Sequence, residues 1–140
     1  MIQRLQSVWL LLAAAAAFCS LEFAFYSGNM VAANAKSWVK LTAQSNLLLL
    51  ILTAGVGIAA LIAIFLYKNR KQQSGLVWIT FLVSIINLIL YFVQVQKFVP
   101  GEGSYNLTAL FAIIVPVFLL LAIRGIRKDQ KLVKSLDRLR

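Results

Sequence analysis

The stretch LLLLILTAGVGIAALIAIFLY, residues 47–67, carries no charged side chain and is the most continuous apolar run in the chain. A helix that crosses the hydrocarbon core of a bilayer needs about 20 apolar residues, and about 17 to 25 are acceptable. Three further stretches meet this requirement, at residues 8–26, 76–95 and 107–123. The sequence therefore predicts an all-α fold, an integral membrane four-helix bundle.

The composition of the whole chain agrees with this prediction. Of its 140 residues, 61% are hydrophobic and only 13% are charged, whereas soluble domains are about half apolar and about a quarter charged. A chain of this length cannot bury so much apolar surface in a core of its own. We therefore expect the lipid bilayer to cover it.

The distribution of Lys and Arg predicts the direction of the spans. With both termini inside, the inner segments hold eleven of these residues and the outer segments hold three. Because cytoplasmic loops of membrane proteins are enriched in Lys and Arg, the sequence predicts an N-in/C-in topology. The three outer residues are Lys36, Lys40 and Lys97.

The C-terminal segment has its own pattern. We expect residues 1–126 to form the transmembrane domain and residues 127–140 to form a cytoplasmic basic amphipathic helix. Its apolar stripe is Leu132, Val133, Leu136 and Leu139, at i, i+1, i+4 and i+7. Such a helix either lies on the anionic inner leaflet or docks on an acidic cytoplasmic protein. The basic residues for this contact are Arg127, Lys128, Lys131, Lys134, Arg138 and Arg140.

The third span carries a polar seam. Spacings of four, three, four and three residues place its members on one helix face, which should point into the bundle or toward a partner. The seam either joins helices through hydrogen bonds or lines a path for a solute. Its members are Thr80, Ser84, Asn87, Tyr91 and Gln94.

Glu22 is the acidic residue that falls within a predicted span. At 1.5 Å per residue, Glu22, Thr53 and Tyr91 reach similar heights. We therefore expect a candidate polar layer of Glu22, Thr53, Asn87, Tyr91 and Gln94, since an intramembrane carboxyl group indicates function. The alternative is that Glu22 reaches the outer interface.

The inventory of reactive side chains is small. The chain has no histidine, one cysteine (Cys19) and four acidic residues, so the commonest general base and metal ligand is missing. We therefore expect no enzyme activity, no cofactor and no metal site. We also expect no binding of nucleic acid, because no reading motif accompanies the net charge of +10.

Several short motifs, in order along the whole chain, resemble a family of small four-span proteins from Bacteroidota, catalogued as domain of unknown function 4293. They are MIQRLQ (1–6), WLLLAA (9–14), IFLYKNRK (64–71), RKD (127–129), LV (132–133) and SLDRLR (135–140). The resemblance implies four helices and a multi-pass location in the bacterial inner membrane. It supplies no catalytic or binding residues.

Two functions are compatible with these features. The preferred hypothesis is a non-catalytic accessory, scaffold or small-subunit role with a membrane or cytoplasmic protein partner. The alternative is a small-solute or cation exporter of the small-multidrug-resistance type that uses Glu22. The sequence leaves open whether the chain forms a homo-oligomer.

Overall fold

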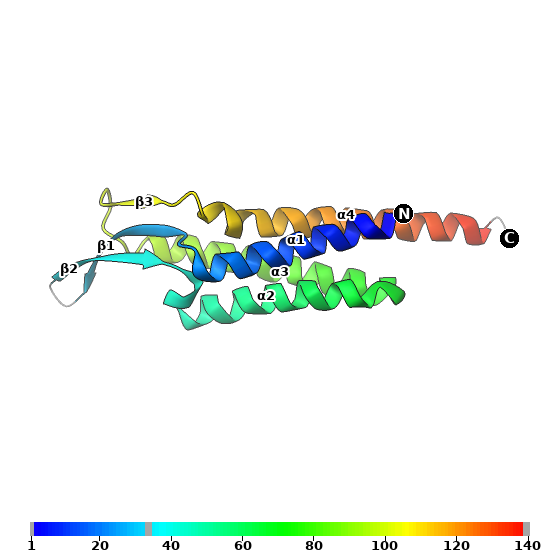
Figure 1. Ribbon diagram of the computed structural model, residues 1–140, viewed down its shortest axis with the longest axis horizontal. Helices are drawn as coiled ribbons and strands as arrows, with labels where there is room; N and C mark the ends of the chain where they lie inside the picture. Colours follow the sequence, from blue (N-terminus) through cyan, green and yellow to red (C-terminus); the bar gives the residue numbers. More distant parts are fainter. Residues whose placement is uncertain (1, 33–34, 139–140) are drawn as a thin grey trace.

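The computed structural model describes residues 2–32 and 35–138. Four long helices and a small sheet make up this part of the chain (Figure 1). Each of the four helices is long and apolar enough to cross a membrane. The elements are α1 (Ile2–Glu22), β1 (Tyr26–Ala32), β2 (Ala35–Leu41), α2 (Leu47–Phe65), α3 (Arg70–Val95), β3 (Gly103–Tyr105) and α4 (Ala109–Arg138).

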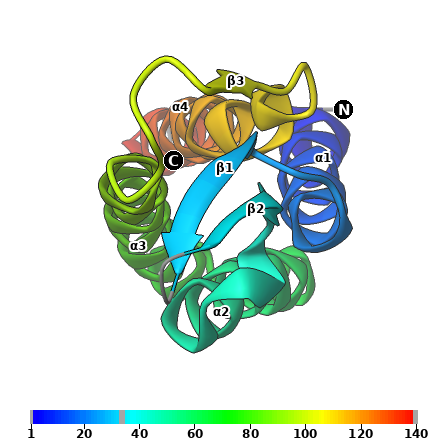
Figure 2. The same ribbon diagram turned by 90° about the vertical axis from the view of Figure 1, so that its left-hand side faces the viewer.

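The four helices form an antiparallel bundle in which α1 packs on α2 and α4, and α3 packs on the same two helices. Viewed along its axis, the bundle is a ring with the helices in chain order (Figure 2). Asparagine caps start two of them, because Asn46 Oδ1 accepts a hydrogen bond from the Leu48 amide at 2.9 Å and Asn69 precedes α3 in the same role. Four helices were predicted, and this part of the prediction is confirmed.

Small side chains on α1 allow its close packing. Ala13 and Ala17 are fully buried and pack with Leu119 and Ile126 of α4. At the far end of this contact, Gln6 lies against Gly125, where an added Cβ would come within 2.9 Å of Gln6 Cγ. The antiparallel pair therefore stays in close contact over the length of α1.

The prediction of an all-α fold was wrong in one region. Strands β1 and β2 pair with each other, and β3 adds to β1 in the order β2-β1-β3, all antiparallel. The sheet lies across the end of the helix ring (Figure 2). Pairing satisfies backbone groups that a loop over the bundle would leave without partners. We call this the hairpin end, formed by residues 23–32, 35–46 and 96–108.

Glycine makes the crossing of β1 and β3 possible. A Cβ on Gly28 would lie 2.9 Å from the Cα of Gly103, and a Cβ on Gly103 would lie 2.5 Å from Tyr26 Oη. Local sequence patterns did not reveal this contact, because its two strands are separated by α2 and α3.

The helix bounds also differ from the predicted spans. α1 ends at Glu22 rather than at residue 26, since the chain turns there into β1. α3 begins at Arg70, six residues before the predicted span, after a short 3-10 turn (Leu66–Lys68). α4 crosses the expected boundary between residues 126 and 127 without a break and continues to Arg138. We call the opposite end of the bundle the basic end, formed by residues 66–73 and 124–138.

Candidate functional site

The polar face of α3 points into the bundle. Thr80, Ser84, Asn87 and Tyr91 are buried, while Gln94 is half-buried nearer the hairpin end. The hydroxyl groups of Thr80 and Ser84 donate to carbonyl oxygens of their own helix, at 2.8 and 2.7 Å. These two side chains are therefore satisfied within α3 and do not join helices.

One hydrogen bond of this face connects two helices. Asn87 Nδ2 on α3 donates to Thr53 Oγ1 on α2 at 2.9 Å, and both side chains are buried. Such a bond between packed helices is worth about 0.6 to 2 kcal/mol. The geometry therefore matches the predicted role of the seam in helix–helix contact at this position.

A small cavity lies beside this bond. Its volume is about 10 Å³, which is close to the minimum for one water molecule. Asn87 Oδ1 and the Tyr91 hydroxyl are buried near this layer and have no hydrogen-bond partner. The cavity is lined by Ala17, Ser20, Thr53, Val56, Ser84, Asn87, Ala112 and Val115.

The structure does not bring Glu22 to this layer. Glu22 is the last residue of α1, its side chain is exposed, and its Oε1 accepts a hydrogen bond from Gln44 Nε2 at 2.8 Å. Because Glu22 is exposed, it does not join the buried side chains of Thr53 and Asn87, although Tyr91 of the predicted layer stacks on Phe25, three residues after Glu22, with ring centroids 4.7 Å apart. The alternative, in which Glu22 reaches the outer interface, stays a prediction.

Polar contacts hold the hairpin end together. Glu102 accepts from Lys36 Nζ at 2.7 Å and from Asn29 Nδ2 at 3.1 Å. The hydrogen bonds from these donors, with the larger effect from Lys36, hold the pKa of Glu102 below its ordinary value. Asn106 Nδ2 donates to Ser27 Oγ at 2.7 Å. Sequence analysis did not find these pairs, because their members are 66 to 79 residues apart.

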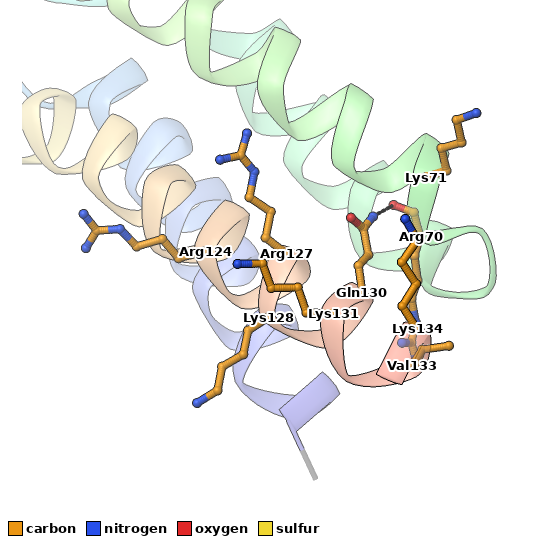
Figure 3. A pocket seen from close by; sticks show the side chains of 9 residues that line it. All are labelled: Arg70, Lys71, Arg124, Arg127, Lys128, Gln130, Lys131, Val133 and Lys134. Atoms are coloured by element: carbon orange, nitrogen blue, oxygen red, sulfur yellow. Dashed lines mark hydrogen bonds between the residues drawn. The ribbon is translucent and has the colours of Figure 1, made fainter. Parts of the chain in front are cut away.

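Cations gather on one side of the basic end. An open pocket of about 990 Å³ lies between the first turn of α3 and the last turns of α4 (Figure 3). Its lining brings together four of the predicted contact residues with Arg70, Lys71 and Arg124. The four are Arg127, Lys128, Lys131 and Lys134; Arg138 is exposed further along α4, and Arg140 lies outside the described residues.

Two contacts order the walls of this pocket. The Arg127 guanidinium lies 4.9 Å from the centre of the Trp78 ring, within the range of a cation–π contact. Gln130 Nε2 donates to the carbonyl oxygen of Arg70 at 3.1 Å, which joins α4 to the start of α3. The pocket is therefore a built part of the bundle.

An apolar face of α4 adjoins this pocket and shares Val133 with it. Buried Leu119, Ala122 and Ile126 follow heptad spacing, and Val133 and Leu136 continue the same register beyond the bundle. Val133 is 41% and Leu136 is 65% exposed, so the core-facing side of α4 has no cover there. Leu132 flanks this face with 44% exposure, and Leu139 lies outside the described residues.

The residues that could hold a metal are few. Within residues 2–32 and 35–138, no group of three or more His, Cys, Asp or Glu side chains could hold a metal ion. Cys19 is a free, half-buried thiol on α1.

The molecule belongs to the class of four-helix bundles whose helices all have membrane-spanning length and apolar character, here with a sheet at one end. The chain is a member of the family described as domain of unknown function (DUF4293), whose family model matches residues 2–139. Neither a curated protein nor a solved structure matches it.

Proposed function

We propose that the chain is a multi-pass protein of the bacterial inner membrane, with its basic end in the cytoplasm and its hairpin end outside. The charge distribution supports this orientation, because the hairpin end carries three Lys residues while the other end and tail carry eleven Lys and Arg. The length of α4 also supports it. Thirty residues at 1.5 Å each give about 45 Å, which exceeds the hydrocarbon core by about 15 Å.

Cysteine labelling in intact cells tests the orientation. In a Cys19→Ala background, single cysteines at Ser37 on β2 and Ser135 on α4 both replace exposed serines. A membrane-impermeant maleimide added to spheroplasts should label position 37 and leave position 135 unlabelled until the cells are lysed. The reverse pattern would overturn the proposed direction.

Within the membrane, the protein serves as a non-catalytic accessory subunit that holds a cytoplasmic partner. The observation that carries this proposal is the uncovered heptad face at Val133 and Leu136, in register with buried Ile126. Because α4 is a continuous helix whose C-terminal part projects past the other helices along the bundle axis (Figure 1), apolar residues near its end are exposed. An apolar face held in water in this way requires a partner.

Charge identifies the kind of partner. Basic side chains border the apolar face as a rim, because Val133 shares the lining of the basic pocket with Arg70 of α3 and with Lys131 and Lys134 of α4. A second copy of the chain would bring the same positive rim and be repelled. An amphipathic helix with acidic flanks would cover the apolar face and neutralise the rim, so we assign the docking site to an acidic helix of a cytoplasmic protein.

Quantitative capture from native membranes in mild detergent tests this role. Val133→Ser/Leu136→Ser should reduce the recovered partner by about tenfold or more, because it removes the apolar contact. Ser135→Gln, on the opposite face of the same helix, serves as the matched control and should retain the partner. Equal recovery with both variants would contradict the docking face, as would a retained partner without an acidic segment.

The exporter alternative has less support. It requires a carboxylate inside the bundle, and Glu22 lies exposed at the hairpin end with Gln44 as its partner. The accessory role predicts that Glu22→Gln leaves resistance to toxic cations unchanged in cells that overproduce the protein. A loss of resistance with this variant, and none with Gln44→Ala, would favour the exporter.

A further inference from the structure

The pocket at the basic end is lined by many positively charged side chains. Its lining includes six Lys or Arg side chains beyond Arg70 but no Asp or Glu. Within the described part of the chain, none of these cations forms an ion pair, since the ion pair found there joins Lys36 and Glu102 at the hairpin end. Like charges three and four residues apart on a helix destabilise it. The fold therefore maintains a cluster of repelling cations.

The start of α3 increases this repulsion. Arg70 and Lys71 occupy the first turn of α3, where the helix dipole is positive and acidic residues are favoured. The Arg70 side chain is also held in place, because its Nη1 donates to the carbonyl oxygen of Asp129 at 3.5 Å. A bound anion would remove both the repulsion between the side chains and the unfavourable interaction with the dipole.

The position of the pocket near a membrane–water interface indicates that the bound anion belongs to a lipid. Trp78, which lies under Arg127, is the kind of residue that marks the membrane–water interface. The cations Arg124, Lys128 and Lys131 of α4 are exposed toward the surroundings of the bundle, whereas Ile126 is buried. Basic pockets at the cytoplasmic ends of spanning helices bind phosphate-bearing lipid headgroups.

We propose that this pocket binds the headgroup of an anionic lipid with two phosphates, of the diphosphatidylglycerol (cardiolipin) type. The number of cations and the volume of about 990 Å³ fit a headgroup with two phosphates better than a single phosphate. Arg70 and Arg127, whose positions are fixed by Asp129 and Trp78, provide planar donors for the phosphates. The Lys side chains add charge around them. This site adjoins the proposed docking face and shares Val133 with it, so the substitutions that test the pocket leave Val133 and Leu136 unchanged.

Native mass spectrometry of the purified full chain in detergent micelles tests the proposal. The probes are cardiolipin, phosphatidylglycerol at matched phosphate concentration, and pyrophosphate. The pocket variant is Lys71→Gln/Lys128→Gln, chosen because both side chains are exposed, so the fold should be kept. Lys40→Gln/Lys97→Gln at the hairpin end makes the same charge change and is the control.

We expect cardiolipin to be retained in preference to phosphatidylglycerol, and pyrophosphate not to displace it at equal concentration. The pocket variant should lower cardiolipin affinity by about thirtyfold, while the control variant should keep it. Equal losses in both variants would show attraction to overall charge and overturn the site. Displacement by equimolar pyrophosphate, or equal retention of the two lipids, would overturn the lipid as its ligand.

Discussion

The two ends of the bundle are built in opposite ways. At the hairpin end, a three-stranded sheet covers the helices, and its charged residue Glu102 is paired with Lys36 and Asn29. At the basic end, α4 continues beyond its neighbours with an uncovered apolar face and with cations that lack ion pairs within the described residues. The hairpin end pairs its strands and Glu102 internally, whereas the basic end holds a cluster of cations without acidic partners in the described part of the chain. This difference is the basis of the sites proposed at the basic end.

We expect substitutions at the two ends to have different effects. Substitutions at the hairpin end should change stability, and substitutions on the exposed faces of the basic end should change binding while stability is kept. The following experiments test this division, beginning with the largest expected effect on stability.

Gly103→Ala should destabilise the hairpin end most. The new Cβ would lie 2.5 Å from Tyr26 Oη, in a buried contact that has little space to adjust. Overpacking of this kind costs about 1 to 3 kcal/mol. Thermal unfolding in detergent measures the loss. Gly75→Ala, where an added Cβ meets nothing within 4 Å, should be neutral or stabilising; equal losses would contradict the role of the β1–β3 crossing.

Asn87→Leu should have the next largest effect. It removes the hydrogen bond to Thr53 that joins α3 to α2, and the expected cost is about 1 kcal/mol. Unfolding in mixed micelles of increasing denaturing detergent gives the difference. Ser84→Ala is the control, because Ser84 donates to its own helix and should cost less. If Asn87→Leu leaves the unfolding free energy unchanged, the seam does not join the helices.

Acidification should loosen the hairpin end by a smaller amount. The pKa of Glu102 is lowered in the folded state by Lys36 and Asn29. Its contribution is therefore present above the ordinary pKa of a glutamate and is lost as pH falls through the lowered value. The protection factors of the β1 and β3 amides, in which the intrinsic pH dependence of hydrogen exchange is divided out, should fall at acidic pH in the wild type. Glu102→Gln should exchange faster at neutral pH and respond less to acid; a response equal to that of the wild type would contradict this pairing.

Val133→Ser/Leu136→Ser should leave stability almost unchanged. Both side chains stand outside the packed part of the bundle, and surface substitutions usually change unfolding free energy by less than about 0.5 kcal/mol. The same thermal unfolding assay checks this. A loss as large as that of Gly103→Ala would mean that the apolar face packs within the protein itself.

Much of the bundle could be predicted from sequence, because spanning length and helical periodicity are local properties. The apolar run of residues 47–67 corresponds closely to α2 (Leu47–Phe65), and the heptad spacing of Thr80, Asn87 and Tyr91 gave their shared buried face. The sheet could not be predicted in this way. Its pairing of Tyr26 with Tyr105 joins segments separated by two helices.

In the candidate sites, too, local features could be predicted from sequence and contacts between distant segments could not. The exposure of Glu22 depended on where α1 ends, and apolar composition does not determine this point to within a turn. The pocket between Arg70 and Arg127 depended on how α3 and α4 are placed side by side. The boundary expected between residues 126 and 127 was drawn from a change in composition, and α4 continues across it.

Site-specific photo-cross-linking from α4 tests the central claim most directly. A photoreactive phenylalanine analogue at Leu136, on the apolar face, is compared in living cells with the same analogue at Ser135 on the opposite face. The account predicts a protein adduct from position 136, absent from position 135, whose cross-linked peptide carries net negative charge. Adducts of lipid alone at position 136, or the same protein adducts from both positions, would contradict it.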